Sequence, residues 1–71
     1  MESVDARGLS CPEPVLRTRR AIAQLAPGEE IEVLVETVTS RENCLRAVRS
    51  LGCTALVEET GDGFRLRIRR E

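Results

Sequence analysis

The segment Cys11-Pro12-Glu13-Pro14 places a nucleophilic side chain at the entrance to a helical pattern. A cysteine thiolate can attack an electrophilic sulfur, and it can also accept and release a sulfur atom. Apolar residues recur at helical spacing from Pro12 to Ala26, which puts Cys11 at the N-cap, Pro12 at the first helical position and Pro14 at the third. A helix N-terminus favours the thiolate. The spacing alone leaves two roles open for Cys11, a sulfur nucleophile or a small capping residue without chemistry.

Composition excludes most other kinds of chemistry. The chain has no histidine, so the usual general base and the commonest metal ligand are both missing. All eleven basic residues are arginine, so no lysine amine is present for Schiff-base chemistry. Cys44 and Cys53 lie far from Cys11 in the sequence and form neither a dithiol pair nor a zinc framework with it. We therefore expect three free thiols, no metal and no cofactor.

Residues beside Cys11 are expected to support its thiol. Gly8 supplies a backbone angle that other residues avoid. Asp5 either orients the loop by accepting backbone amides or is an ordinary charge on an edge strand. The amides of Glu13 and Val15 are donors that can reach the thiolate, although the Glu13 carboxylate opposes it. Arg7 brings positive charge to the same loop.

Alternating and helical patterns predict four strands and two helices. Val4 and Ala6 alternate with polar residues, and a capping-box spacing from Thr39 to Glu42 opens a second helix that Gly52 ends. The strand at 30–36 and the hairpin strands at 53–60 and 64–70 follow, with a turn at 61–63. The residues expected to face the core are Val15, Thr18, Ala21, Ile22, Leu25, Ile31, Val33, Val35, Cys44, Ala47, Val48, Leu51, Phe64, Leu66 and Ile68. Cys53 is also expected to be structural.

The element order βαβαββ predicts an α+β fold, a two-layer sandwich with both helices on one face of a mixed four-stranded sheet. Opposite charges on the open face favour the strand order 1-2-4-3, because they then meet across neighbouring strands. These charges are Arg65, Arg67 and Arg69 on one strand and Glu30, Glu32 and Glu36 on the other. The 71 residues are expected to form one domain, residues 1–71.

The carboxyl ends of the parallel strands share one edge, where open sheets commonly bind ligands. That edge is expected to carry Cys11, the start of the second helix and the turn at 61–63. Arg17, Arg20 and Arg41, with Arg7, can meet an acidic partner there. Simple solvation of the helices explains the same arginines equally well.

The segment "VDARGLSCPEP", with Asp5, Gly8, Cys11, Pro12 and Pro14, resembles the C-P-x-P signature of the TusA/SirA family of small sulfur carriers. The resemblance covers almost the whole chain. It implies a fold like the C-terminal domain of a bacterial translation initiation factor. It also implies that Cys11 accepts a persulfide from a cysteine desulfurase or rhodanese-type donor and relays it to an acceptor protein. That step is a sulfurtransferase-type relay rather than stand-alone turnover.

Two details refine the resemblance. The segment "TSRENCLRAVRSLG" is most similar to the YedF-like branch, whose role has been linked to selenium or general sulfur metabolism. Members that serve tRNA thiolation usually read Gly-His where this chain has Gly52-Cys53, which argues against that pathway.

Charge and hydropathy set the expected surroundings. The net charge is −1 and Phe64 is the lone aromatic, so we expect no direct nucleic-acid binding. The chain has no apolar run long enough to span a membrane, and its start lacks the features of a signal peptide, so we expect a cytoplasmic monomer that meets its partners by transient docking. The alternative is a non-catalytic interaction or regulatory module that contacts RNA, which an arginine excess on one exposed face without paired glutamates would favour.

Overall fold

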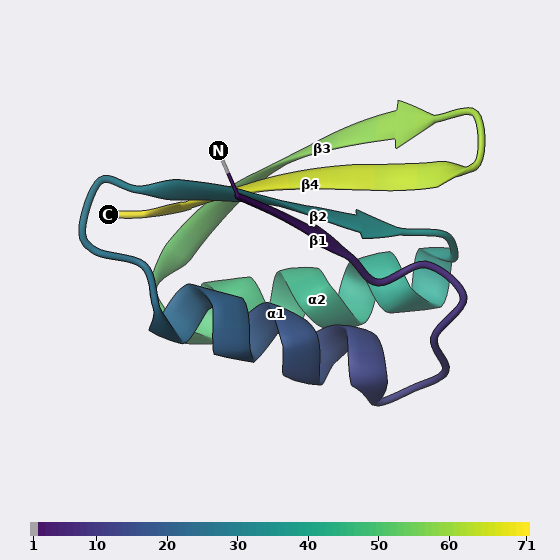
Figure 1. The fold of residues 1–71 in the computed structure, drawn as a ribbon, viewed down its shortest axis with the longest axis horizontal. Coiled ribbons are helices and arrows are strands. Elements are labelled where there is room, and N and C mark those ends of the chain that lie inside the picture. The colour runs from purple at the N-terminus through teal and green to yellow at the C-terminus, as the bar shows by residue number, and fades with distance from the viewer. Residues whose placement is uncertain (1) are drawn as a thin grey trace.

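The computed structural model describes residues 2–71, and Met1 lies outside them. The elements are β1 (Glu2–Asp5), α1 (Glu13–Ala23), β2 (Glu30–Val35), α2 (Val38–Ser50), β3 (Cys53–Thr60) and β4 (Gly63–Arg70). One sheet has the order β1-β2-β4-β3, and both helices cover the same face of it (Figure 1). β1 and β2 are parallel, whereas β4 is antiparallel to both of its neighbours. The predicted α+β two-layer sandwich and the strand order 1-2-4-3 are therefore confirmed.

The charge pattern that predicted the strand order is only partly realised as ion pairs. Glu30 lies opposite Arg69 in the register of β2 and β4, and Glu32 lies opposite Arg67. Arg65, however, forms ion pairs with Glu32, its diagonal neighbour on β2, and with Glu58 on β3. The prediction that all three glutamates of the 30–36 segment meet these arginines is wrong for Glu36, whose carboxylate accepts a hydrogen bond from a loop elsewhere.

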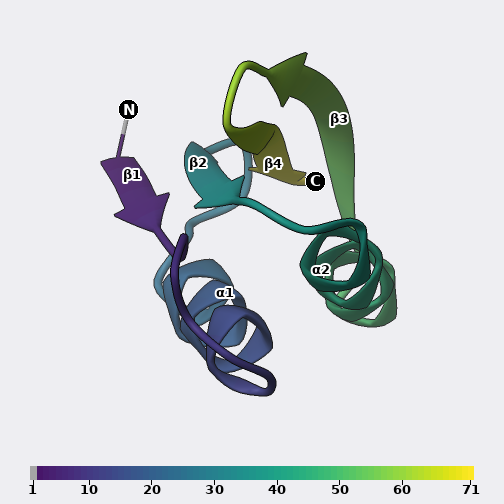
Figure 2. The ribbon, with the colours of Figure 1, turned by 90° about the vertical axis from the view of Figure 1, so that its right-hand side faces the viewer.

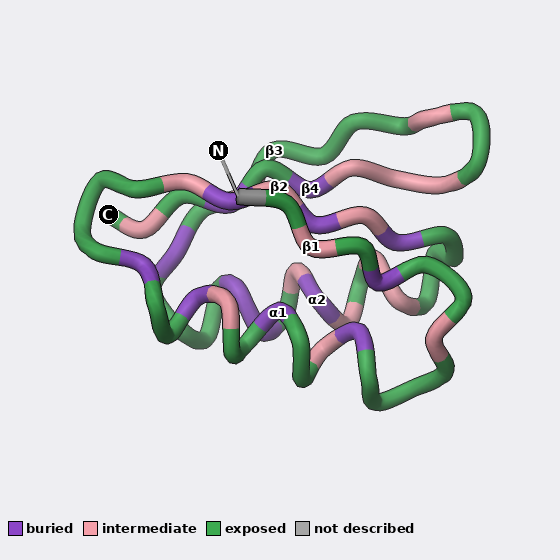
Figure 3. Tube along the Cα trace, viewed as in Figure 1, coloured by how far each residue is buried: buried purple, intermediate pink, exposed green. Residues whose placement is uncertain are grey.

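The core lies between the sheet and the two helices (Figure 3). It includes Ile31, Val33, Val35, Leu66 and Ile68 from the sheet, Ile22 and Leu25 from the α1 region, and Cys44, Ala47 and Val48 from α2. These burials are as predicted. Leu51 is an exception, because it is the C-cap of α2 and is 43% exposed. Gly52 follows it with a φ of 76°, as expected of a residue that ends a helix.

α2 begins two residues earlier than the capping-box spacing predicted. Thr37 is the N-cap, and its hydroxyl oxygen accepts a hydrogen bond from the Ser40 amide at 3.0 Å. Threonine is a favoured N-cap residue, and both Thr37 and Thr39 lie between β2 and the apolar stripe of α2. Because β2 already ends at Val35, the helix begins at the earlier of the two threonines. The Thr39–Glu42 capping box is therefore wrong.

The end of α1 is fixed by the last strand. Arg70 of β4 donates hydrogen bonds to the carbonyl oxygens of Leu25 at 2.8 Å and Ile22 at 3.5 Å. A guanidinium at this position satisfies carbonyl groups at the helix C-terminus and complements the helix dipole. α1 itself ends at Ala23, three residues before the predicted Ala26. This contact anchors the far end of the helix that begins beside Cys11.

The carboxyl ends of β1 and β2 lie at one edge of the molecule, and the loops that enter α1 and α2 leave from this edge (Figures 1 and 2). The turn between β3 and β4 lies at the same end (Figure 1). Within residues 2–71, no helix is both long and apolar enough to cross a membrane.

Candidate functional site

Cys11 is exposed and lies in a turn immediately before α1. The N-cap is Pro12, whose peptide bond with Cys11 is cis, and Pro14 is the second helical residue. The predicted placement of Cys11 at the N-cap is thus wrong by one residue. The reason is a tight turn, in which the Glu13 amide donates a hydrogen bond to the Ser10 carbonyl oxygen at 2.9 Å. That amide is occupied, so the expectation that it bonds the Cys11 thiolate is also wrong.

A network of charges braces the loop between β1 and Cys11. The Arg7 guanidinium donates hydrogen bonds to both carboxylate oxygens of Asp5, each at 2.9 Å, and the Arg7 amide donates to Asp5 at 3.1 Å. Arg7 also reaches Asp62 in the β3–β4 turn at 2.6 Å. These hydrogen bonds from Arg7 lower the pKa of Asp5 to about 2, and the Asp5 carboxylate raises the pKa of Arg7. Arg7, which was expected to help in docking, is held between two carboxylates.

Gly8 fixes the next bend of the same loop. Its φ is 77°, a left-handed conformation that glycine adopts without a Cβ clash. Its amide donates a hydrogen bond to the carboxylate of Glu36, the first residue after β2. The alternation at 30–36 predicted Glu36 on the open face, and its hydrogen bond to Gly8 was not predicted. The signal was its position, because the residue after β2 must lie near the residues that follow the parallel strand β1.

The first turn of α1 is tied to α2 through buried side chains. The Thr18 hydroxyl donates a hydrogen bond to the Pro14 carbonyl oxygen at 2.8 Å and lies 3.4 Å from the Cys44 sulfur. Thr18 and Pro14 are themselves fully buried. Burial raises the pKa of the Cys44 thiol, which therefore stays protonated and unreactive. Cys44 and Cys53 are both buried, as predicted.

Two hollows meet at Cys11. The first has a volume of about 200 Å³ and is lined by Leu9, Ser10, Cys11, Pro14, Val15, Thr37, Thr39, Ser40 and Asn43. The second has a volume of about 470 Å³ and is lined by Cys11, Pro12, Val15, Arg19, Asn43, Arg46, Ala47 and Ser50. The edge predicted from the strand ends does bring Cys11 to the start of α2.

The predicted docking arginines do not line either hollow. Arg17 forms an ion pair with Glu13 at 3.6 Å. Arg41 lies 3.6 Å from the Glu42 carboxylate and 4.7 Å from the centre of the Phe64 ring. Arg20 is exposed on the surface of α1. Arg19 and Arg46, which do line the second hollow, were missed.

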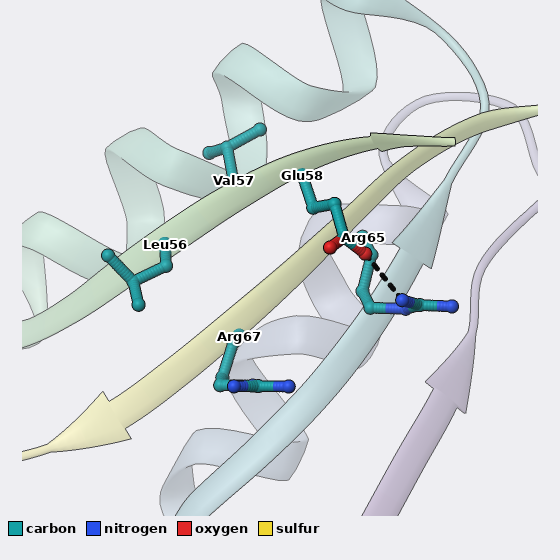
Figure 4. A pocket seen from close by; sticks show the side chains of 5 residues that line it. All are labelled: Leu56, Val57, Glu58, Arg65 and Arg67. Atoms are coloured by element: carbon teal, nitrogen blue, oxygen red, sulfur yellow. Dashed lines mark hydrogen bonds and ion pairs between the residues drawn. The ribbon is translucent and has the colours of Figure 1, made fainter. Parts of the chain in front are cut away.

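A further hollow lies on the open face of the sheet and contains no nucleophile (Figure 4). Its lining residues are Leu56, Val57, Glu58, Arg65 and Arg67, and the figure shows Glu58 and Arg65 paired. The exposed thiol and this open face are thus separate features. Among residues 2–71, Cys11 is the one exposed thiol.

Comparison with known proteins gives the family. The family described as "Sulfurtransferase TusA" matches residues 2–70. The chain belongs to the TusA family. A relative from Methanocaldococcus jannaschii is 39% identical over 71 residues, which cover 99% of this chain and 95% of the relative; its name provisionally describes it as a sulfur carrier protein. A relative from Thermotoga maritima with the same provisional description is 38% identical, covering 84% of this chain and 77% of its own.

A solved structure extends this likeness to the fold. The crystal structure of a SirA-like protein from Desulfitobacterium hafniense superposes with a TM-score of 0.84 at 32% identity, covering 96% of this chain and 93% of that one. The resemblance to the TusA/SirA family stated from the sequence is therefore confirmed. The assignment to the YedF-like branch stays a prediction.

Proposed function

We propose that this TusA-family protein is a sulfur-relay carrier that holds the transferred sulfur on Cys11. The observation that carries the proposal is that Cys11 is the one exposed cysteine of three, at an edge where two hollows meet. Cys44 and Cys53 are buried and have no access to a partner protein. The relatives described provisionally as sulfur carriers support the same role.

The relay consists of two exchanges that neither consume nor supply electrons overall. The Cys11 thiolate attacks the outer sulfur of a persulfide on a donor enzyme of the cysteine desulfurase or rhodanese type. A bond forms between the Cys11 sulfur and that outer sulfur, the donor's own sulfur–sulfur bond breaks, and the donor cysteine leaves as a thiolate. An acceptor thiolate then attacks the outer sulfur on Cys11, and Cys11 leaves as the thiolate.

The surroundings of Cys11 suit exchange between proteins. A domain of this size has no deep cavity, so the sulfur is carried on the surface, where both partners can reach it. The braces at Asp5, Arg7, Gly8 and Glu36 hold the loop without covering the thiol. We place the relay in the cytoplasm, where thiols remain reduced, and expect a monomer that docks transiently. The segment 39–52 and Cys53 favour a YedF-like pathway over tRNA thiolation.

The intact mass of the protein tests this proposal. After incubation with a cysteine desulfurase and cysteine, the parent protein should gain one sulfur atom on Cys11. Cys11→Ser should gain none, whereas Cys53→Ser should gain one like the parent. Sulfur found on Cys44 or Cys53 of the folded parent, or an undiminished gain in Cys11→Ser, would overturn the assignment of Cys11.

The alternative, an interaction module that contacts RNA, has one observation in its favour. α1 and α2 together carry six arginines and only two glutamates. The same helices, however, flank the exposed thiol, and the chain has no aromatic residue other than Phe64 on which bases could stack. A carrier that docks a partner protein on these helices accounts for both the thiol and the charge.

A further inference from the structure

Charge is divided unequally between the two layers of the protein. The six arginines and two glutamates of α1 and α2 give the helical layer a net charge of +4. The whole chain has a net charge of −1, so the remaining residues sum to −5. A basic face on an acidic protein attracts acidic surfaces to one side and orients them before contact. The helical layer is that face, and Cys11 lies at its edge.

Within the helical layer, Arg19 of α1 and Arg46 of α2 line the groove that also contains Cys11. Both residues are exposed. Among residues 3–71, neither has a carboxylate within 4.0 Å, whereas Arg17 and Arg41 each have one and Arg7 has two. These two guanidiniums therefore keep their charge and their hydrogen-bond donors available in the groove that leads to the thiol.

We propose that the groove between α1 and α2 binds an acidic segment of the partner protein in the sulfur relay. The inference rests on the proposed function and adds the chemistry of the partner to it. Arg19 and Arg46 hold carboxylates of the segment, because a guanidinium binds a carboxylate through two parallel hydrogen bonds. The segment then delivers its sulfur-bearing residue to Cys11. Asn43, which lines both hollows, lies where it can bond the backbone of the same segment.

The groove fits a peptide better than it fits RNA. Its apolar lining consists of Pro12, Val15 and Ala47, which are small side chains without aromatic rings. Phe64 is half-buried, and its ring lies 4.7 Å from the Arg41 guanidinium carbon, so that this contact covers it. Single-stranded RNA binding normally combines positive charge with aromatic stacking. Only the charge is present here.

Thiol–disulfide exchange with short peptides tests the groove directly. Two peptides each carry a terminal cysteine activated as its 2-thiopyridyl disulfide, one preceded by six glutamates and the other by a neutral Gly-Ser sequence. The Cys11 thiolate attacks the peptide cysteine sulfur, a protein–peptide disulfide forms, and pyridine-2-thione leaves with a measurable absorbance. At low salt the acidic peptide should react about tenfold faster than the neutral one, the enhancement expected of electrostatic attraction at a charged site.

Matched variants separate the groove from the general charge of the layer. Arg19→Gln/Arg46→Gln should remove most of the preference for the acidic peptide. Arg20→Gln/Arg49→Gln removes the same charge from the same two helices, but outside the groove. This variant should keep most of the preference for the acidic peptide. The preference of each protein is the ratio of its rate with the acidic peptide to its rate with the neutral peptide, so a change in the reactivity of Cys11 itself cancels. Salt at 0.5 M should abolish the preference in every protein, because the Debye length is then only about 4 Å.

Three results would overturn the inference. The first is no preference for the acidic peptide, and the second is an equal loss of that preference in both double variants. The third is a single-stranded RNA 12-mer that binds more tightly than the acidic peptide and depends on Arg19 and Arg46 for its binding. Failure of the proposed function gives a different result. In that case the parent gains no sulfur from a cysteine desulfurase and cysteine, although Cys11 still exchanges with both peptides. If the groove alone fails, the parent still takes up sulfur from the desulfurase and the peptides show no difference.

Discussion

Cys11, just before α1, and Cys44, within α2, differ most in their exposure to solvent. Cys11 is exposed in a turn whose loop is held by hydrogen bonds and ion pairs on the surface. Cys44 is fully buried, and its neighbours include the Thr18 hydroxyl and the strands of the sheet. Polar contacts at the surface hold the loop of Cys11 in place and leave its thiol accessible, whereas packing in the core makes the thiol of Cys44 inert. The same side chain therefore serves exchange in one region and stability in the other.

Alkylation should give the largest difference between the two cysteines. Cys11 should react with iodoacetamide as an ordinary exposed thiol. Cys44 reacts only when the domain opens, and a domain stable by about 5 kcal/mol is open roughly once in several thousand molecules. Cys11 should therefore be labelled at least about a thousandfold faster than Cys44. Peptide mapping after brief treatment measures both rates, and equal labelling in the folded protein would remove the distinction between the two regions.

Serine substitutions should separate the two thiols by stability. Cys44→Ser puts a more polar group into the core, and its hydroxyl competes for the Thr18 hydroxyl, whose proton already bonds Pro14. A buried group without a good partner costs about 1–3 kcal/mol of unfolding free energy. Cys11→Ser exposes the same hydroxyl to water and should leave stability unchanged. Urea unfolding measures both, and equal midpoints for the two variants would contradict the comparison.

Much of the architecture could be predicted because it depends on strong periodic patterns. Alternation in the strands and the placement of Arg67 and Arg69 opposite glutamates led to the correct sheet order. Burial of Cys44 followed from its place on the apolar stripe of the second helix. These features depend on which face of an element is apolar, and that information is local to each element.

The details of the site could not be predicted to the same extent, because they depend on contacts between distant loops. The Ser10–Glu13 turn shifted the start of α1 by one residue, and nothing in the spacing of the prolines distinguishes the two starts. The role of Glu36 requires the loop after β1 to lie against the end of β2. The groove arginines depend on how α1 and α2 lie against each other. Helical spacing shows that Arg19 is not on the apolar stripe, but it does not show what stands across the groove.

A change at Glu36 should loosen the Cys11 loop without unfolding the domain. Glu36→Ala removes the acceptor of the Gly8 amide, and that amide should exchange with solvent hydrogen at least about tenfold faster, since a hydrogen bond to a charged group contributes about 1.5–3 kcal/mol locally. Global stability should change by less than about 1 kcal/mol, because the bond is exposed. Glu59→Ala, on the edge strand β3, is the control and should leave Gly8 unchanged. Unaltered exchange at Gly8 in Glu36→Ala would show that the loop is held by other contacts.

Removing the ion pair between Asp5 and Arg7 should have the smallest effect on stability, and this effect should depend on pH. Hydrogen bonds from Arg7 lower the pKa of Asp5 from 3.8 to about 2 in the folded protein. A carboxyl group whose folded pKa is depressed stabilises the fold fully above its unfolded pKa, and this contribution is lost as the pH falls from 3.8 through 2. Asp5→Asn keeps the size of the side chain and removes its charge. The parent should therefore melt slightly above this variant at pH 5, and the difference in melting temperature should shrink steadily as the pH falls and vanish below pH 2. A difference that stays constant between pH 5 and pH 2 would mean that the shape of Asp5, and not its charge, braces the loop that carries Cys11.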